Sequence, residues 1–453
     1  MNAKTELSLA AFRCDITPPL GHPLSGGWLP PVARVLDPLW ANGVILHDGA
    51  NPPIVLLALD WAGLMNGGHD DWRRAIAEAV GTTADRVCIH CVHQHDALWA
   101  DPEADALLEK FGLPYRSSER EFFHKAMCDV AVSARGALGA MSEVTHVGAA
   151  QAEVERVASN RRVMGENGKV MATRYSACRE PEMRVAPEGL IDPLLKTVSF
   201  WDGNRLLAGL HFYATHPMSF YGTGEVSSDF VGLARDELAR ETKAPQLYFT
   251  GGAGNITAGK YNDGSPPMRS ILTNRMLTAM RDALQNTQPQ PAPPIKWSSL
   301  LVSFVGRAQF GEEYSRSVLT AQAQPEADFF SEACNRFCAA SKVVWLRRLA
   351  AGRRINFNCL ALGNIRVLFL PGEPFIEYQL YAARLCPEKF VAFAGYGDCA
   401  PAYLPTDKAF VEGGYETGQW SFVEPCEYII CDAIAALLGK PPQALDSLVE
   451  SRP

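Results

Sequence analysis

The chain has 453 residues, of which 47% are hydrophobic and 20% charged, and it carries a formal net charge of −8. This is the composition of a soluble globular protein, and the acidic balance excludes the basic surface typical of nucleic-acid binding. No apolar stretch approaches the ~20 residues of a membrane span, so we expect no stable membrane insertion. Residues 1–19 contain no apolar run of signal-peptide length, which indicates a cytoplasmic protein whose twelve cysteines are reduced.

Apolar strands alternate with amphipathic helices along the first two thirds of the chain. Strands are predicted at 44–48, 54–64 and 86–93, with a helix at 71–80 between the last two. The alternation returns with strands at 197–202, 206–217 and 245–250 and helices at 229–240 and 268–284. The pattern predicts an α/β fold in which helices flank a mixed central β-sheet.

A Pro-rich segment, 287–295, reads as an extended connector. The segments after it again have the pattern of sheet and helix, with a helix predicted at 329–352 and a hairpin at 357–374 closed by Gly363-Asn364. We therefore interpret residues 1–453 as one large domain that contains the connector.

The segment RVCIHCVHQHDA, residues 86–97, concentrates histidine and cysteine. Alternation along a strand places Cys88 and Cys91 on opposite faces, so this C-x-x-C pair is not expected to close on one metal. The same alternation places His93 and His95 on one face at the end of the strand, where α/β folds build their sites. Two interpretations stay open: a metal-binding H-x-H pair, or two hydrogen-bonded histidines.

Other candidate residues also follow predicted strands. His216 precedes Pro217 at the end of the strand 206–217, whereas His211 inside that strand is expected to be a hydrogen-bonded core histidine. Glu373 lies in LPGEPF at a strand-to-helix turn, where capping of the helix is the alternative role. Two histidines and one carboxylate would form a hydrolase-like zinc site with an open position, although spacing alone does not show that the three converge.

Nine short motifs in order resemble the neutral ceramidase family, the zinc amidases that cleave the N-acyl bond of ceramide. The motifs are FRCDITPP, DPLWANGVIL, CVHQHDA, SNRR, ATHPMS, SSDFVG, GAGNITAG, LPGEPF and APAYLPT, and they cover most of the chain. The resemblance implies the fold of that family's catalytic domain and a zinc-dependent amidohydrolase activity.

The resemblance also assigns roles to residues. It implies four Zn2+ ligands, namely His93, His216, Glu373 and Tyr403. It further implies that His95 steadies the oxyanion or passes a proton, that Arg161 holds the substrate oxygen or a carboxylate product, and that Thr257 stands where the family has an active-site serine. Substrate-binding roles are expected for Tyr415, Asn255 and Trp99, and Asp60 is expected to orient a metal-bound histidine from the second shell.

Departures from the family pattern concern the residues that face substrate. They are Gln94 to Ala97, Thr257 to Gly259, and Val411 in place of a tyrosine. The chain also ends near residue 453 without the family's C-terminal immunoglobulin-like domain. We therefore expect a soluble small-molecule amide as the substrate, attacked at its carbonyl by zinc-bound hydroxide.

Three alternatives to this function remain. The first is a zinc-dependent esterase, lactonase or lyase that acts on a polar substrate, and the second is a true ceramidase. The third is a non-catalytic ligand-binding relative with a structural zinc. A small-molecule substrate is the only partner that we expect, no nucleic acid is expected, and assembly into a homo-oligomer stays open.

Overall fold

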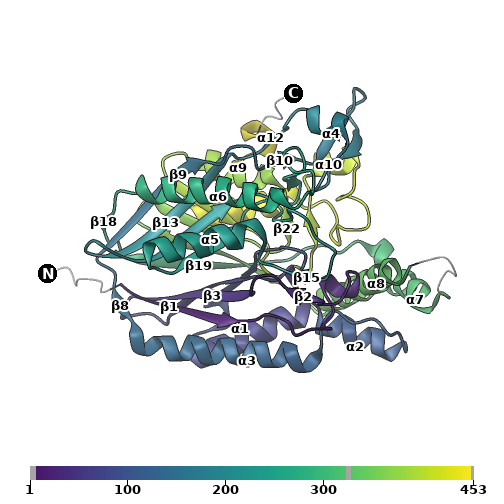
Figure 1. The fold of residues 1–453 in the computed structure, drawn as a ribbon, viewed down its shortest axis with the longest axis horizontal. Helices are drawn as coiled ribbons and strands as arrows, with labels where there is room; N and C mark the ends of the chain where they lie inside the picture. The colour runs from purple at the N-terminus through teal and green to yellow at the C-terminus, as the bar shows by residue number, and fades with distance from the viewer. Residues whose placement is uncertain (1–6, 323–327, 450–453) are drawn as a thin grey trace.

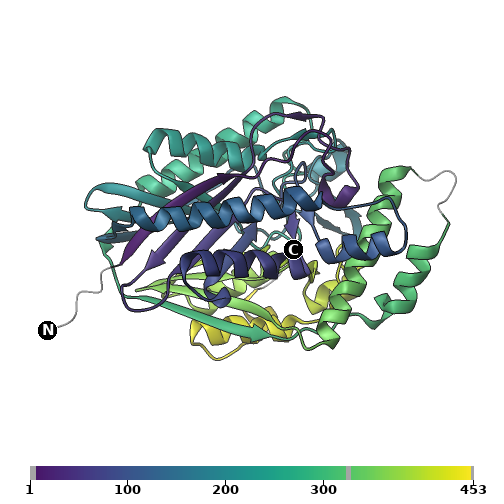
Figure 2. The same ribbon diagram turned by 90° about the horizontal axis from the view of Figure 1, so that it is seen from below.

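A computed structural model describes residues 7–322 and 328–449. The first sheet has the strand order β6-β4-β3-β1-β8, and helices α1 (Asn66–Val80) and α3 (Arg120–Ala137) cover its outer face (Figures 1 and 2). Its strands are β1 (Ser8–Asp15), β3 (Trp40–His47), β4 (Ile54–Leu59), β6 (Val87–Cys91) and β8 (Ser142–Glu143). All six residues of β4, IVLLAL, are buried, as expected for a central strand with both faces covered.

The second sheet has the order β16-β14-β13-β9-β18 and carries helices α5 (Asp229–Thr242) and α6 (Pro267–Gln285). Its strands are β9 (His146–Glu153), β13 (Leu194–Asp202), β14 (Arg205–Tyr213), β16 (Gln246–Thr250) and β18 (Gln290–Pro291). The Pro-rich connector therefore contributes a two-residue edge strand, a place where proline is tolerated because no ladder donor is needed.

The third sheet has the order β19-β20-β21-β23, with helices α9 (Ile376–Leu385) and α11 (Glu427–Leu438) packed against it. Its strands are β19 (Ile295–Val302), β20 (Ile355–Leu362), β21 (Ile365–Phe369) and β23 (Phe390–Ala394). Helices α7 (Glu312–Thr320) and α8 (Phe329–Ala350) form an arm at one end of the molecule, where α2 (Pro102–Lys110) packs on α8 (Figure 1).

Short elements complete the fold and carry several site residues. They are β2 (Arg34–Val35), β5 (Gly63–Leu64), β7 (Trp99–Ala100), β10 (Ser159–Asn160), β11 (Arg162–Met164), β12 (Val170–Thr173), β15 (Glu225–Val226), β17 (Ile256–Thr257), β22 (Glu373–Pro374), β24 (Tyr403–Leu404), α4 (Pro181–Val185), α10 (Asp407–Glu412) and α12 (Leu445–Leu448).

Each sheet contains one parallel pair of strands: β4 with β6, β14 with β16, and β21 with β23. Strand β16 contacts the first sheet and β14 contacts β23, so the three parallel pairs lie close together. The mixed α/β fold expected from the sequence is confirmed; its longer strands lie in three mixed sheets, and the short strands of the described residues pair in two-stranded sheets. The carboxyl ends of parallel strands are where α/β folds bind ligands.

Other expectations can be compared with the structure. All twelve cysteines are free thiols. Among the residues that the structure describes, no helix combines the length and the apolarity needed to cross a membrane. The strands predicted at 54–64, 86–93 and 206–217 stop earlier, at Leu59, Cys91 and Tyr213, because the chain turns before reaching the polar residues that follow.

Candidate metal centre and active site

His93 lies two residues beyond β6, in a loop fixed by the neighbouring strand. The backbone N–H of Val92 donates to the carbonyl of Leu59, and that of His93 donates to the carbonyl of Trp61. His93 has φ of +76°, a left-handed conformation that is costly for a side chain of this size. His93 and His95 do face one space, as predicted, but both lie beyond the end of β6 at Cys91, so a turn and not strand alternation directs their side chains.

His216 and Glu373 reach the same region from the other two sheets. His216 follows β14, and its backbone N–H donates to the carbonyl of Ile256. Glu373 follows β21 through Gly372, which has φ of +62° and where a Cβ would lie 2.8 Å from the carbonyl oxygen of Ala402. Only glycine fits this turn without strain, so the Pro-Gly-Glu sequence fixes the direction of the Glu373 side chain.

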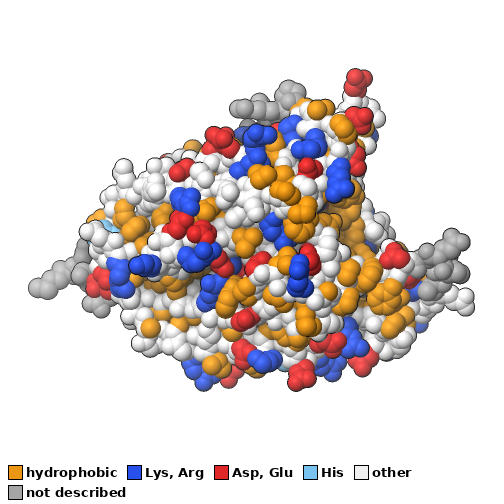
Figure 3. Space-filling view, viewed as in Figure 1, with side chains coloured by type: hydrophobic (Ala, Val, Ile, Leu, Met, Phe, Trp, Pro, Cys, Tyr) orange, Lys and Arg blue, Asp and Glu red, His pale blue; other side chains and the backbone are white. Residues whose placement is uncertain are grey.

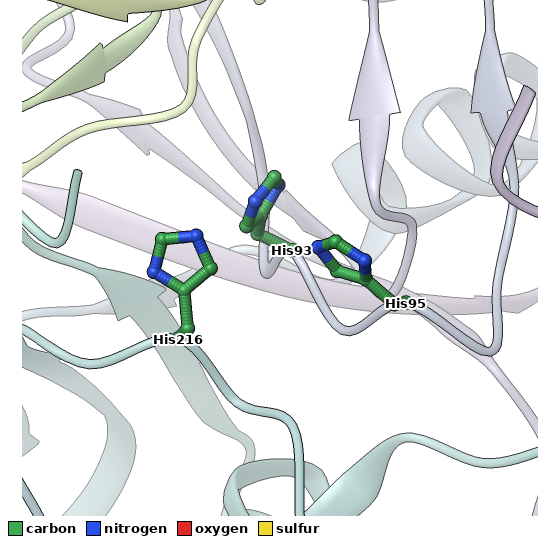
Figure 4. Close-up of side chains that lie close together, drawn as sticks. All are labelled: His93, His95 and His216. Carbon is green, nitrogen blue, oxygen red and sulfur yellow. The ribbon is translucent and has the colours of Figure 1, made fainter. Parts of the chain in front are cut away.

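The three side chains converge. Nε2 of His93 lies 3.3 Å from Oε2 of Glu373, and Nε2 of His216 lies 3.4 Å from the same oxygen. Ligand atoms of His93, His95 and His216 all lie within 4.8 Å of one another, and the three rings surround one space (Figure 4). Four buried atoms have no hydrogen-bond partner in the described part of the chain: Nε2 of each of the three histidines and Oε2 of Glu373.

Hydrogen bonds on the far side of each ring assign the tautomers. Nδ1 of His93 lies 2.5 Å from the carbonyl oxygen of Ala62, and Nδ1 of His216 lies 3.0 Å from that of Ile256. A carbonyl oxygen only accepts, so each Nδ1 carries the proton and each Nε2 presents a lone pair. Burial lowers the pKa of His216 to about 4, despite the nearby Glu373, so its ring is neutral near pH 7.

These residues fit a metal ion. Burial raises the pKa of the Glu373 carboxyl, and positive charge on the adjacent histidines would lower it; with the neutral tautomers assigned above, a metal cation is the charge that would keep the carboxyl ionised. Two lone pairs and a carboxylate oxygen then face one another in a buried space. Such an arrangement is unfavourable without a cation, and it is the donor set that zinc prefers.

Asp60 does not orient a metal-binding histidine. Its two carboxylate oxygens accept from Arg235 at 2.6 and 3.0 Å, and Oδ2 also accepts the backbone N–H of Trp40. Both side chains of the pair are fully buried. The backbone carbonyls of Ala62 and Ile256 fill the role that we predicted for Asp60.

Tyr403 lies beside the cluster. Strand β24 pairs with β22 in parallel, with Tyr403 opposite Glu373. The Arg161 guanidinium lies 4.8 Å from the Tyr403 ring centroid and 5.3 Å from that of Tyr415, so the two rings flank it. Ligation of a metal by the Tyr403 oxygen stays a prediction.

Arg161 is 4% exposed and held in place from several directions. Its Nε donates to Glu416 at 2.7 Å and its Nη2 to the carbonyl of Gly254 at 2.5 Å. Glu416 also accepts from Arg162 at 2.9 Å, so one carboxylate neutralises part of both guanidinium charges. Sequence reasoning missed Glu416, for which adjacency to Tyr415 was the one available signal.

Two predicted site residues have their polar groups engaged with the protein. Thr257 donates its hydroxyl to the carbonyl of Arg174 at 3.1 Å. Asn255 accepts the backbone N–H of Ile376 and donates to Glu377, both at 2.9 Å, so it caps the first turn of α9. The side chains of Thr257 and Asn255 therefore make supporting contacts, and among the described residues neither makes a hydrogen bond to the histidine cluster.

Aromatic side chains surround the cluster. The Trp99 ring lies 5.3 Å from His93 and 6.1 Å from His95. Further ring contacts have centroids 5.3–6.3 Å apart. We call Trp28, Trp99, Tyr175, Tyr221, Tyr415 and Trp420 the aromatic rim. Tyr175 and Tyr221 are 53% and 40% exposed, so the rim reaches the surface. Figure 3 shows apolar side chains gathered in a band from the end with α4 and α10 toward the α7–α8 arm.

Comparison with known proteins gives a structural likeness and no likeness in sequence. No protein-family model and no curated protein matches this chain by sequence. A ceramidase complexed with C2 superposes on 99% of this chain and 78% of its own, with a TM-score of 0.69 and 15% identity. The neutral ceramidase from Pseudomonas aeruginosa also superposes on 99% of this chain and over 78% of its own length, with a TM-score of 0.67 and 14% identity.

The chain has the neutral ceramidase fold. The resemblance stated from short sequence motifs is thereby confirmed as a likeness of structure over nearly the whole chain. At this level of identity the likeness establishes the fold, and activity has to be argued from the site itself.

Proposed function

We propose that this chain is a zinc-dependent hydrolase that cleaves the amide, or N-acyl, bond of a small molecule. The observation that carries the proposal is the convergence of Nε2 of His93, Nε2 of His216 and Oε2 of Glu373, which are buried and have no hydrogen-bond partner within residues 7–322 and 328–449. These three residues would hold the metal, with Tyr403 as the fourth ligand. Zinc at such a site supplies Lewis acidity, which polarises a carbonyl and makes water nucleophilic near neutral pH.

Residues of the chain would perform the remaining steps. His95 has an unpartnered Nε2 beside His93 and is placed to hold or pass a proton during cleavage of the C–N bond. Arg161 is fixed between two tyrosine rings and can present its free guanidinium edge to a substrate oxygen. Because Glu416 neutralises part of the Arg161 charge, a neutral oxygen suits this position as well as a carboxylate.

The aromatic rim bears on the size and polarity of the substrate. Six rings from separate segments stand around a small cluster of charged and polar groups, an arrangement that favours a compact substrate with a flat or cyclic part. We therefore expect a soluble amide to be turned over better than a long-chain ceramide presented on a membrane.

An activity panel with metal analysis tests the proposal. Purified protein would be assayed against N-acyl amino acids, N-acyl amines, lactones and ceramide, alongside His93→Ala and Glu373→Ala. We expect about one zinc per chain, turnover of an N-acyl compound, and loss of both zinc and activity in the two variants. Variants that keep both zinc and activity would contradict the metal site. Ceramide turnover equal to that of the best soluble substrate would contradict the substrate class.

A further inference from the structure

Tyr396 lies between the segments that carry the proposed metal ligands. It follows β23 after Gly395 and is fully buried. Its backbone N–H donates to the carbonyl of Gly372, the residue before Glu373, at 2.8 Å. Its own carbonyl accepts the N–H of Cys91, the last residue of β6, at 2.9 Å. The loop at Tyr396 therefore joins the turn of Glu373 to the turn of His93.

The Tyr396 ring packs on the metal-binding histidines. Its centroid lies 4.4 Å from that of His93 at an interplanar angle of 34° and 6.2 Å from that of His216 at 89°. The residue has φ of +63°, a backbone conformation that is unfavourable for a bulky side chain. Strain of this kind persists where the surrounding structure enforces it, and it concentrates at active sites.

The hydroxyl of Tyr396 is buried and has no hydrogen-bond partner among the described residues. Buried tyrosine hydroxyls normally have one, since leaving a donor unsatisfied is costly. Tyr248 and Tyr378, also fully buried, donate to the carbonyls of Tyr213 and Pro405. Tyr396 therefore retains a spare donor next to the cluster.

A phenol hydroxyl donates one hydrogen bond, which suits a group that meets an electron-rich oxygen. Tyr213 is another fully buried tyrosine that has no ring contact with the histidines among the described residues, so it offers a comparison.

We propose that Tyr396 is a further catalytic residue, whose hydroxyl donates a hydrogen bond to the carbonyl oxygen of the bound amide. The inference rests on the proposed hydrolytic function. When the oxygen of water bonds to the carbonyl carbon, the π electron pair moves to the carbonyl oxygen, and the hydrogen bond strengthens as this oxyanion forms. When the carbonyl re-forms, the C–N bond breaks and its electron pair moves to the nitrogen, which takes the proton released by the attacking water. Tyr396 keeps its own proton throughout.

Tyr396→Phe is the decisive variant, because it removes one oxygen atom and preserves the ring packed on His93. We expect kcat to fall about 10²–10³-fold with KM within a few fold of the parent, as for loss of one oxyanion donor. We also expect the zinc affinity, measured by calorimetry on metal-free protein, to stay within about threefold. Tyr213→Phe, the matched control, is expected to keep kcat.

Binding of acetohydroxamate to zinc-loaded protein gives a second readout that needs no substrate. Its oxygen anion imitates the reacting oxygen, so Tyr396→Phe is expected to weaken binding about tenfold, the effect of one hydrogen bond. If Tyr396→Phe keeps the kcat and the hydroxamate affinity of the parent, the inference is overturned and the hydrolase proposal stands. If Tyr396→Phe binds zinc much more weakly than the parent, Tyr396 is a metal ligand and the inference is overturned. A parent protein that binds no zinc and hydrolyses nothing in the panel would overturn both proposals.

Discussion

Replacing Glu373 by glutamine should change stability in opposite directions with and without metal. In the metal-free protein, Oε2 of Glu373 is a buried charged acceptor without a hydrogen-bond partner. A glutamine amide could instead donate to the lone pairs of His93 and His216, whose Nε2 atoms lie 3.3 and 3.4 Å from that oxygen. Removing one unsatisfied buried group stabilises a protein by about 1–3 kcal/mol. The free energy of unfolding of metal-free Glu373→Gln should therefore be higher than that of the metal-free parent.

Zinc should reverse this order. At a zinc concentration about 1,000 times the dissociation constant, the parent gains about 4.1 kcal/mol in free energy of unfolding. A variant that binds zinc about 1,000-fold more weakly gains less than about 1 kcal/mol under the same conditions.

Urea denaturation followed by tryptophan fluorescence, with and without zinc, measures both differences. Glu377→Gln is the matched control, because Glu377 is a nearby carboxylate that accepts from Asn255 and does not contact the histidines. An equal zinc-induced gain in the parent and in Glu373→Gln would refute the assignment of Glu373 as a ligand.

Three further predictions follow from the same contacts. Asp60→Asn should lower the free energy of unfolding in urea by about 3 kcal/mol, because buried Arg235 loses the negative charge of its partner, and the variant should retain zinc. Asp71→Asn, which removes a solvent-accessible ion pair, should change stability little. Loss of zinc in Asp60→Asn would restore the role first predicted for that residue. His95→Ala should lower kcat about 10²–10⁴-fold in steady-state assays while atomic absorption still finds one zinc per chain, and normal turnover would remove His95 from catalysis. Dialysis against a chelator should abolish turnover and added zinc should restore it, whereas full activity of the chelated protein would contradict a catalytic metal.

Local sequence signals located the candidate site but did not explain its geometry. Hydrophobic patterning placed His93, His216 and Glu373 at the ends of predicted apolar strands, and the structure brings all three together. The side-chain directions could not be predicted from strand periodicity, because His93 adopts a left-handed backbone that only contacts with Trp61 and Ala62 enforce. Tertiary contacts overrode the local pattern.

Partners distant in sequence could not be predicted from spacing. Asp60 was expected near a histidine from the family resemblance, because a metal-bound histidine usually donates its other N–H to an oxygen, yet its partner Arg235 comes from α5, which packs on the second sheet. Glu416 binds Arg161 across 255 positions of sequence. Tyr396 belongs to no motif, and its importance is visible only in the contact of its ring with His93.

Anomalous diffraction at the zinc edge, on crystals of protein purified without chelator, tests the central claim most directly. The account predicts one strong peak bounded by Nε2 of His93, Nε2 of His216 and Oε2 of Glu373. Stoichiometric zinc with its peak elsewhere in the molecule, or no peak in crystals supplied with zinc, would contradict it.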